Sequence, residues 1–189
     1  MICELKELDM NMGKKEYEMF QDIPSKEAGS TNLCKGLPFK VFSNFIESQL
    51  QRKINNISIY DTPTTTYIFY IDQYPVGYIC LRTQIDEKWE KWSGNIYYTI
   101  RLKERKKGYG TLMLKELLSL CKKNGTTSLL AQSCKGNLAS SKTIEKNNGI
   151  FLAENNGTKY YRFDLKFFSP AINLSNNSTF SPSEDKLLK

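Results

Sequence analysis

Residues 105–111 read RKKGYGT and lie between a strand-like run that ends near Arg101 and the most regular apolar pattern in the chain. The pattern R-x-x-G-x-G-T places Gly108 and Gly110 where the backbone must turn tightly into a helix, and glycine permits this because it lacks a Cβ atom. A helix that begins there presents N–H groups without helical acceptors, and its dipole favours a negative charge. The stretch therefore predicts a pyrophosphate-binding loop, or else a flexible loop that only starts a helix.

The helix after this loop is indicated by apolar residues at helical spacing, with Asn124 and Gly125 as its expected C-terminal end. Ser128 to Ser133 then predicts a short buried strand. A strand, a helix and a second strand at this spacing normally give two parallel strands, so residues 95–101 and 128–133 are expected to run parallel. The apolar residues of the helix are Tyr109, Leu112, Met113, Leu117, Leu120 and Cys121.

The segment that follows, residues 137–151, reads NLASSKTIEKNNGIF. Asn137 is the expected N-cap of a helix that runs to about Asn147, and Gly149 is expected to end it. Two further strands, at residues 150–154 and 159–165, flank an Asn-Asn-Gly turn typical of a β-hairpin. The strand at 159–165 offers an edge through which two copies would pair as a homodimer, and sedimentation that shows only monomer would reject this.

Upstream of the loop, apolar periodicity predicts a weak helix over residues 14–20 and a stronger one over residues 38–53. Residues 65–71 and 76–83 are rich in β-branched and aromatic residues, and a turn over residues 72–75 joins them as a hairpin. Helices are thus expected to lead, and a partly antiparallel sheet to follow. The order of the elements predicts a mixed α/β fold.

The composition is that of one ordinary domain. The chain has 189 residues, a net charge of +7, a pI of about 9.1 and 40% hydrophobic residues. Residues 1–168 are expected to form the domain, and the Ser-, Asn- and Pro-rich residues 169–189 a flexible tail. The amino terminus lacks the pattern of a signal peptide and no run is long enough to span a membrane, so a cytoplasmic location is expected.

The absence of histidine restricts the chemistry that is available. It excludes a histidine base, a histidine nucleophile partner and histidine metal ligands. The five cysteines are widely and irregularly spaced, which indicates neither a disulfide framework nor a zinc site, so no metal is expected.

A basic run beside the glycine loop predicts either an anionic partner or a solvated loop. A nucleic-acid-binding domain is one alternative, but it would call for exposed aromatic residues among the cations, and Tyr109 alone lies nearby. Nucleic acid is therefore the less favoured partner. The cations of the run are Arg101, Lys103, Arg105, Lys106 and Lys107.

Residues 105–111 and 137–151 together resemble the GCN5-related N-acetyltransferase (GNAT) superfamily, in which an R/Q-x-x-G-x-G/A loop is followed, after a helix and a strand, by an N-x-x-[AS] segment. The resemblance covers about residues 64–165. It implies a GNAT-like acyl-CoA N-acyltransferase fold, with helices on both faces of a mixed central sheet that splays at the cofactor site. The core would span about residues 64–166, after a helical part over about residues 1–60.

The resemblance also implies that acetyl-CoA is the co-substrate. Its pantetheine arm would enter between the two splayed strands and pair with main-chain groups near Ile100 and Leu102. Loop amides would hold the pyrophosphate, and Asn137 would bind the cofactor arm. The cofactor-binding residues implied are Ile100, Leu102, Arg105, Lys107, Gly108, Tyr109, Gly110, Thr111, Asn137 and Ser140.

The implied reaction is N-acetyl transfer to a small-molecule or peptide amine by direct attack. The sequence departs from the family at both usual proton-handling positions, because Asn95 stands where a carboxylate base is common and Ile144 where a tyrosine acid is common. Tyr98, or Tyr160 or Tyr161, is a candidate replacement, although packing or rim exposure is the favoured explanation for each tyrosine. The departures keep open a non-catalytic module that only binds acetyl-CoA, and turnover with an amine distinguishes it.

Overall fold

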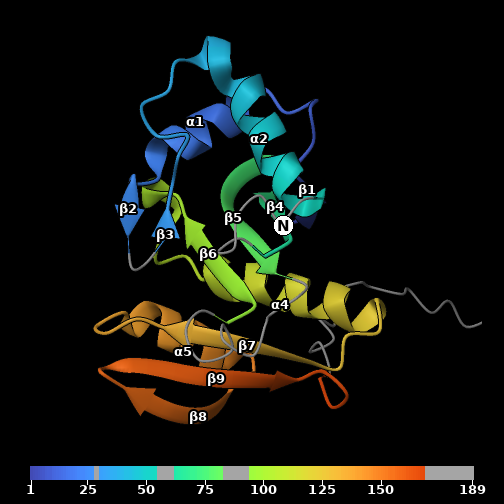
Figure 1. Cartoon of the computed structure of the whole chain (residues 1–189), viewed down its shortest axis with the longest axis vertical. Helices are drawn as coiled ribbons and strands as arrows, with labels where there is room; N and C mark the ends of the chain where they lie inside the picture. The colour runs from blue at the N-terminus through green and yellow to red at the C-terminus, as the bar shows by residue number, and fades with distance from the viewer. Residues whose placement is uncertain (28–29, 55–61, 83–93, 169–189) are drawn as a thin grey trace, which may run out of the picture.

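The computed structural model describes residues 1–27, 30–54, 62–82 and 94–168, and within them the main sheet has the strand order β1-β4-β5-β6-β7-β9-β8 (Figure 1). Neighbouring strands pair antiparallel, except for β6 and β7, which run parallel as predicted. The strands are β1 Cys3–Glu7, β4 Thr64–Ile71, β5 Tyr74–Arg82, β6 Ile96–Ile100, β7 Ser128–Ser133, β8 Ile150–Asn155 and β9 Thr158–Asp164, and a separate hairpin joins β2 Lys26–Glu27 to β3 Ser30–Thr31.

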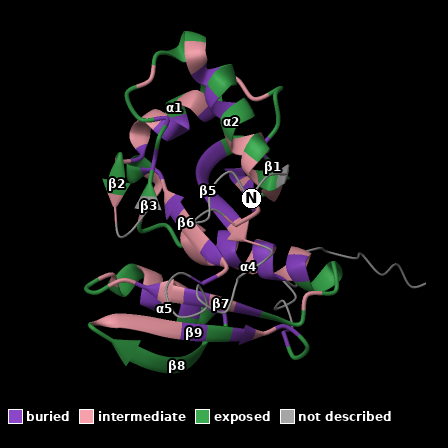
Figure 2. Cartoon of the chain, in the orientation of Figure 1, coloured by how far each residue is buried: buried purple, intermediate pink, exposed green. Residues whose placement is uncertain are grey.

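Helices cover both faces of the sheet, as predicted. Helices α1 (Lys14–Asp22) and α2 (Phe42–Ile54) pack on one face, whereas α4 (Tyr109–Lys123) and α5 (Leu138–Lys146) pack on the other. The residues of β4 are almost all buried because helices cover both of its faces: Ile68 and Tyr70 contact the first pair of helices, and Phe69 contacts the second. Its neighbour β5 is also mostly buried (Figure 2). Because successive side chains of a strand point to opposite faces, a strand covered on both faces is apolar throughout.

The amino-terminal end of the chain was predicted wrongly. A strand, β1, comes before the first helix and pairs antiparallel with β4 at one edge of the sheet. Its Cys3 and Leu5 pack against the α4 side, while Glu4 and Lys6 alternate with them and pair with each other at 3.0 Å. Five residues, of which three are charged, give too weak a period for sequence patterns to detect.

The turn between β4 and β5 is shorter than predicted. Only Asp72 and Gln73 form the turn, with φ values of 46° and 65°, and Tyr74 already belongs to β5. Positive φ at both central residues gives the turn that matches the twist of two antiparallel strands.

The helix ends near the carboxyl terminus are largely as predicted. The Asn137 side chain accepts a hydrogen bond from the Ser140 amide at 3.1 Å, which caps α5. Asn148, with φ of 62°, rather than Gly149, makes the left-handed turn after this helix. Gly149 is needed for a different reason, because a Cβ atom there would lie 2.4 Å from the Ile144 side chain.

The exposed edge of the sheet on this side is β8, not the strand predicted. Strand β9, which contains most of residues 159–165, lies between β7 and β8 and is paired on both sides. Ile150, Phe151 and Leu152 of β8 are all about half exposed. Homodimer formation stays a prediction, and β8 is the strand that would pair.

Two expectations about organisation concern the ends of the chain. The predicted tail, residues 169–189, lies outside the described residues, so the division into domain and tail stays a prediction. Within the described ranges, the model contains no helix with the length and apolar character needed to cross a bilayer.

Candidate functional site

Strands β6 and β7 separate soon after they meet, which opens the sheet at its centre (Figure 1). Their register contains one Cα pair, Ile96 with Ala131, whereas β7 pairs with β9 along its whole length. The Arg101 amide donates to Val76 of β5 at 2.9 Å. Since pairing alternates along a strand, the main-chain groups of Tyr98 and Ile100 face away from β5 and toward the opening.

Asn95 holds the strands together at the point where they begin to part. Its amide N–H donates to the Leu130 carbonyl and its Oδ1 accepts from the Leu130 amide, both at 2.7 Å. Its Nδ2 donates to the Arg82 carbonyl at 3.0 Å. Both polar atoms of the Asn95 side chain thus form hydrogen bonds that join β5 to β7, and neither atom can act as a base.

This role can be tested with Asn95→Asp, which introduces the carboxylate that the GNAT resemblance leads one to expect at this position. The carboxylate cannot donate to the Arg82 carbonyl, so the free energy of unfolding is expected to fall by about 1–3 kcal/mol in urea denaturation. Asn156→Asp, in the exposed β8–β9 turn, is the matched control and is expected to change it by less than about 0.5 kcal/mol. If Asn95→Asp left the free energy of unfolding unchanged, the Asn95 side chain would not be holding the two strands together.

The glycine loop leads directly into α4. Gly108 is the N-cap residue with φ of 82°, a left-handed conformation that favours glycine. Its carbonyl accepts from the Thr111 and Leu112 amides at 3.0 and 3.2 Å. The amides of Tyr109 and Gly110 begin the helix, where N–H groups have no helical acceptor. Such N–H groups at a helix N-terminus are suited to bind an anion, so pyrophosphate binding by this loop stays a prediction.

A cavity of about 1320 Å³ extends from this loop along the opening between β6 and β7. Leu102 and Lys107 are outside its lining: Leu102 lies in a half-exposed 3-10 turn, and the exposed Lys107 pairs with Glu104 at 2.8 Å. Lys106 lines the cavity in addition. The predicted residues that do line it are Ile100, Arg105, Gly108, Tyr109, Gly110, Thr111, Asn137 and Ser140.

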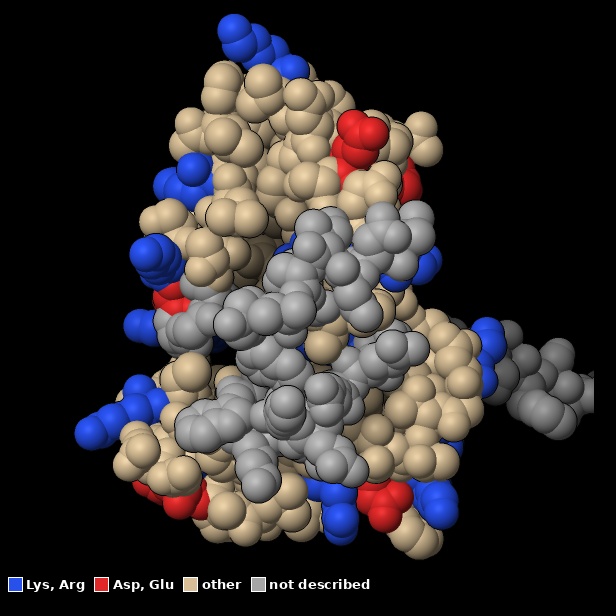
Figure 3. All heavy atoms as spheres, viewed as in Figure 1, with Lys and Arg blue, Asp and Glu red and all other residues tan. Residues whose placement is uncertain are grey.

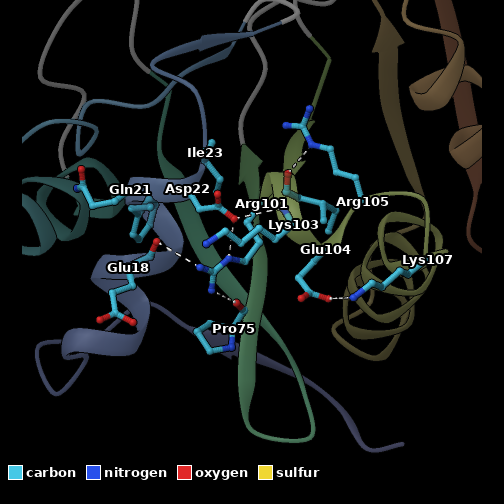
Figure 4. A network of polar contacts seen from close by, with 12 residues as sticks. Glu18, Gln21, Asp22, Ile23, Pro75, Arg101, Lys103, Glu104, Arg105 and Lys107 are labelled. Carbon is cyan, nitrogen blue, oxygen red and sulfur yellow. Dashed lines mark hydrogen bonds and ion pairs between the residues drawn. The ribbon is translucent and has the colours of Figure 1, made fainter.

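Three cations of the predicted basic cluster form ion pairs with different carboxylates: Arg101, Arg105 and Lys107. Arg101 is buried and its Nε lies 3.0 Å from Asp22 Oδ2 of α1, and Figure 4 shows this pair well apart from the pair formed by Lys107 and Glu104. On the face seen in Figure 3, Lys and Arg side chains stand in separate groups along the margins with acidic groups between them. This dispersal gives little support to a nucleic-acid surface.

Arg105, the arginine of the motif, is held by a residue that sequence patterns did not reveal. Its Nη1 donates to Glu27 Oε1 at 2.7 Å, its Nη2 donates to the second oxygen of Glu27, and its Nε donates to the Ile100 carbonyl at 2.8 Å. Arg105 thus fastens the β2–β3 hairpin to the loop. No local signal marks Glu27, because its partner is 78 residues away in the sequence.

Tyr98 points toward the helix side of the opening. Its hydroxyl lies 3.1 Å from Ser140 Oγ. Burial raises the pKa of the Tyr98 phenol, and hydrogen bonds with Ser140 and Thr143 oppose the rise. The phenol is therefore protonated at neutral pH and is suited to donate a proton rather than to accept one.

Neither the position where a tyrosine acid is common, Ile144, nor the other two candidate tyrosines line the cavity. Ile144 is fully buried in the core. Tyr161 is buried and donates to Glu145 at 3.0 Å, and neither Tyr160 nor Tyr161 is among the described residues that line the cavity.

The cavity is also lined by residues that the sequence did not single out. They come from the β2–β3 region, α2, β5, β6 and β7, and each segment alone carries no motif. These residues are Thr31, Leu33, Arg52, Arg82, Tyr97 and Gln132.

Comparisons with known proteins agree with this geometry. The model of the acetyltransferase (GNAT) family matches residues 36–150. No curated protein matches the sequence.

Solved structures resemble the fold at low sequence identity. RimL, a ribosomal L7/L12 alpha-N-protein acetyltransferase in complex with coenzyme A, is 13% identical with a TM-score of 0.63, over 86% of this chain and 93% of that one. The microcin C7 self-immunity acetyltransferase MccE, in complex with acetyl-CoA and AMP, is 14% identical with a TM-score of 0.63, over 86% and 92%. The Campylobacter jejuni N-acetyltransferase PseH, in complex with acetyl-CoA, is 15% identical with a TM-score of 0.55, over 86% and 99%.

Proposed function

We propose, from the premise that this chain belongs to the acetyltransferase (GNAT) family, that it transfers the acetyl group of acetyl-CoA to the amine of a small-molecule or peptide acceptor. Acetyl-CoA is the co-substrate of the family. The single observation that carries the proposal is the opening between β6 and β7, which leads to a glycine loop at a helix N-terminus.

The residues around the opening fit acetyl-CoA. Tyr98 and Ile100 offer main-chain groups to pantetheine amides, in the way that a sheet edge binds an extended chain. The Ile100 carbonyl already accepts from Arg105, so the Ile100 amide and the Tyr98 main chain are the groups available. Tyr109 and Gly110 present their amides to the pyrophosphate, and a Cβ atom at Gly108 would face open space, so a ligand has room there.

The reaction needs positioning and proton transfer. The acceptor amine, once it has lost a proton to water, attacks the thioester carbonyl carbon and forms the C–N bond. The nitrogen then gives up its second proton to water, the C–S bond breaks, and the thiolate takes up a proton. A main-chain N–H at the opening polarises the carbonyl, and the cavity holds the two reactants together. Tyr98 is the proton donor that we assign to the leaving thiolate, because its phenol is protonated and lines the cavity.

Tyr98→Phe is expected to lower kcat by about 100-fold, a typical loss when a general acid is removed, and to leave the Kd of acetyl-CoA unchanged. Acetylated product is measured by mass spectrometry, since the five cysteines interfere with thiol detection. Tyr160→Phe is the control and should have no effect, because Tyr160 does not line the cavity. An unchanged kcat in Tyr98→Phe would leave the tyrosine with a packing role.

The function is tested first by calorimetry with acetyl-CoA and with free CoA. One saturable site is expected, and thermal unfolding should show a gain of about 2.7 kcal/mol at a hundredfold excess over Kd. A panel of amines then tests transfer. Binding without turnover of any amine would favour a module that only binds acetyl-CoA, and the absence of binding would reject the proposal.

A further inference from the structure

A glutamine in the cavity lining has an oxygen that the protein leaves without a donor. Gln132 of β7 lines the cavity, and its Oε1 is buried with no hydrogen-bond partner among the described residues. The large majority of buried polar atoms in folded proteins have a partner, because an acceptor that has lost its water and gained no donor is costly. An unpaired oxygen beside a cavity is therefore a candidate contact for a ligand.

Gln132 stands next to the point where β6 and β7 part (Figure 1). The register of these strands contains one Cα pair, Ile96 with Ala131, and Gln132 is the next residue of β7. In the proposed function the pyrophosphate lies at the start of α4, and the pantetheine arm runs back along β6 past Ile100 and Tyr98. The thioester is at the other end of that arm, so it lies toward the point of parting and toward Gln132.

Gln132 and Tyr98 face opposite sides of the sheet. Ala131 packs in the core on the α4 side, so its neighbour Gln132 faces the α1 and α2 side, as Tyr97 does on β6. Tyr98 packs on the α4 side. A pantetheine arm that pairs with β6 lies in the sheet, so its thioester turns one face to each side. Because we assign Tyr98 to the leaving thiolate, the side of Gln132 is open to the amine.

The cavity extends on the side of Gln132. Thr31 and Leu33, which follow the β2–β3 turn, line it. The next residue, Cys34, is buried in the cluster that α1 and α2 form with the sheet. The segment that carries Thr31 and Leu33 thus belongs to the α1 and α2 side, and the space between it and Gln132 is available for an acceptor.

A neutral oxygen suits the reacting amine better than a carboxylate does. The carboxylates of the described lining, Glu27 and Glu104, each form an ion pair with a cation of residues 105–107. A carboxylate beside an amine favours its protonated form, and an ammonium has no lone pair for attack. A glutamine oxygen accepts a hydrogen bond from an N–H group and carries no charge that would hold the extra proton on the nitrogen.

The oxygen of Gln132 can turn toward a ligand at little cost. The terminal torsion of a glutamine side chain has a broad minimum, so the amide group rotates easily. No donor in the described part of the chain holds Oε1 in its present orientation. Rotation into the cavity therefore breaks no hydrogen bond of this oxygen.

We propose that Gln132 Oε1 accepts a hydrogen bond from the acceptor amine and orients the nitrogen lone pair toward the thioester carbonyl carbon. This inference rests on the proposed function and names the residue that holds its nucleophile. The neutral amine donates one N–H to Gln132 while its lone pair forms the C–N bond. An amide oxygen is not a base, so the protons of the nitrogen pass to water and none passes to Gln132.

Gln132→Met removes the oxygen and preserves the length of the side chain. Acetylation of spermidine, tyramine, glucosamine and a peptide with a free α-amine is followed by mass spectrometry, and kinetics are measured with each amine that reacts. At saturating amine, kcat should fall by about 10- to 100-fold because the nucleophile loses its orientation. The Kd of acetyl-CoA should stay unchanged in calorimetry. Leu130→Met, on the same face of β7 but outside the described lining, is the matched control and should alter neither value.

Thermal unfolding of the free protein gives a second readout, which does not depend on the identity of the acceptor. Gln132→Met replaces an unpaired buried oxygen with an apolar group, so Tm should rise by about 2 °C or more. Leu130→Met should produce no such rise. A residue whose role is only structural would instead lose stability on substitution.

The outcomes separate this inference from the proposed function. If an amine is acetylated but Gln132→Met leaves kcat unchanged, or raises only the KM of the amine, the inference is overturned and the function stands. A fall in Tm would assign the oxygen to the protein, and weaker acetyl-CoA binding would assign it to the cofactor; either result overturns the inference. If the unsubstituted protein acetylates no amine, transfer itself is rejected, and this inference with it.

Discussion

Gly108→Trp is expected to weaken acetyl-CoA binding by at least 100-fold while the protein stays folded. A Cβ atom at Gly108 has no heavy atom within 4 Å, and the residue lines the cavity at the start of α4, so an indole there would occupy the space proposed for the cofactor. The φ of 82° adds a strain of about 1–2 kcal/mol for any residue with a side chain. Calorimetry measures the affinity, and urea denaturation measures the free energy of unfolding.

Gly125→Trp is the matched control at the other end of the same helix. Gly125 also has φ of 82° and open space around its Cβ position, but it does not line the cavity. Both variants should lose similar stability, and only Gly108→Trp should lose binding. Equal loss of binding in both would attribute the effect to strain, and normal binding in Gly108→Trp would place the cofactor elsewhere.

Asp22→Asn is expected to lower the free energy of unfolding by about 3 kcal/mol, which corresponds to a fall in Tm of about 6–12 °C. The Asp22 and Arg101 side chains are 15% and 6% exposed, and their ion pair joins α1 to the end of β6. Arg101 also donates to the Pro75 and Glu18 carbonyls (Figure 4). The substitution therefore leaves a buried guanidinium without its countercharge, and urea and thermal unfolding measure the cost.

Glu4→Gln provides the comparison for an exposed pair. Glu4 and Lys6 lie 3.0 Å apart with side chains 41% and 52% exposed, so water screens the attraction. A change below about 1 kcal/mol is expected. If Asp22→Asn costs no more than Glu4→Gln, the Arg101 pair contributes nothing special to the attachment of α1.

The part of the site near the cofactor could be predicted because its signals are local. Gly108, the start of α4 and the Asn137 cap depend on the backbone conformation of a few consecutive residues, and each residue type favours that conformation by itself. The parallel arrangement of β6 and β7 follows from the length of the connection between them. The error at β1 has the converse cause, since a short charged strand is stabilised by β4 and α4 and not by its own pattern.

Sequence alone determined the order of most helices and strands and the glycine loop at the start of a helix, because these depend on neighbours in the chain. Tertiary structure decided which cations form ion pairs: Arg101 pairs with Asp22 and Arg105 with Glu27, in each case a residue about 80 positions away in the sequence. It also brought Arg52 of α2 and Arg82 of β5 into the lining of the same cavity. Charge and burial act between groups that are close in space, so the ion pairs of a site are fixed only when the packing of distant segments is fixed.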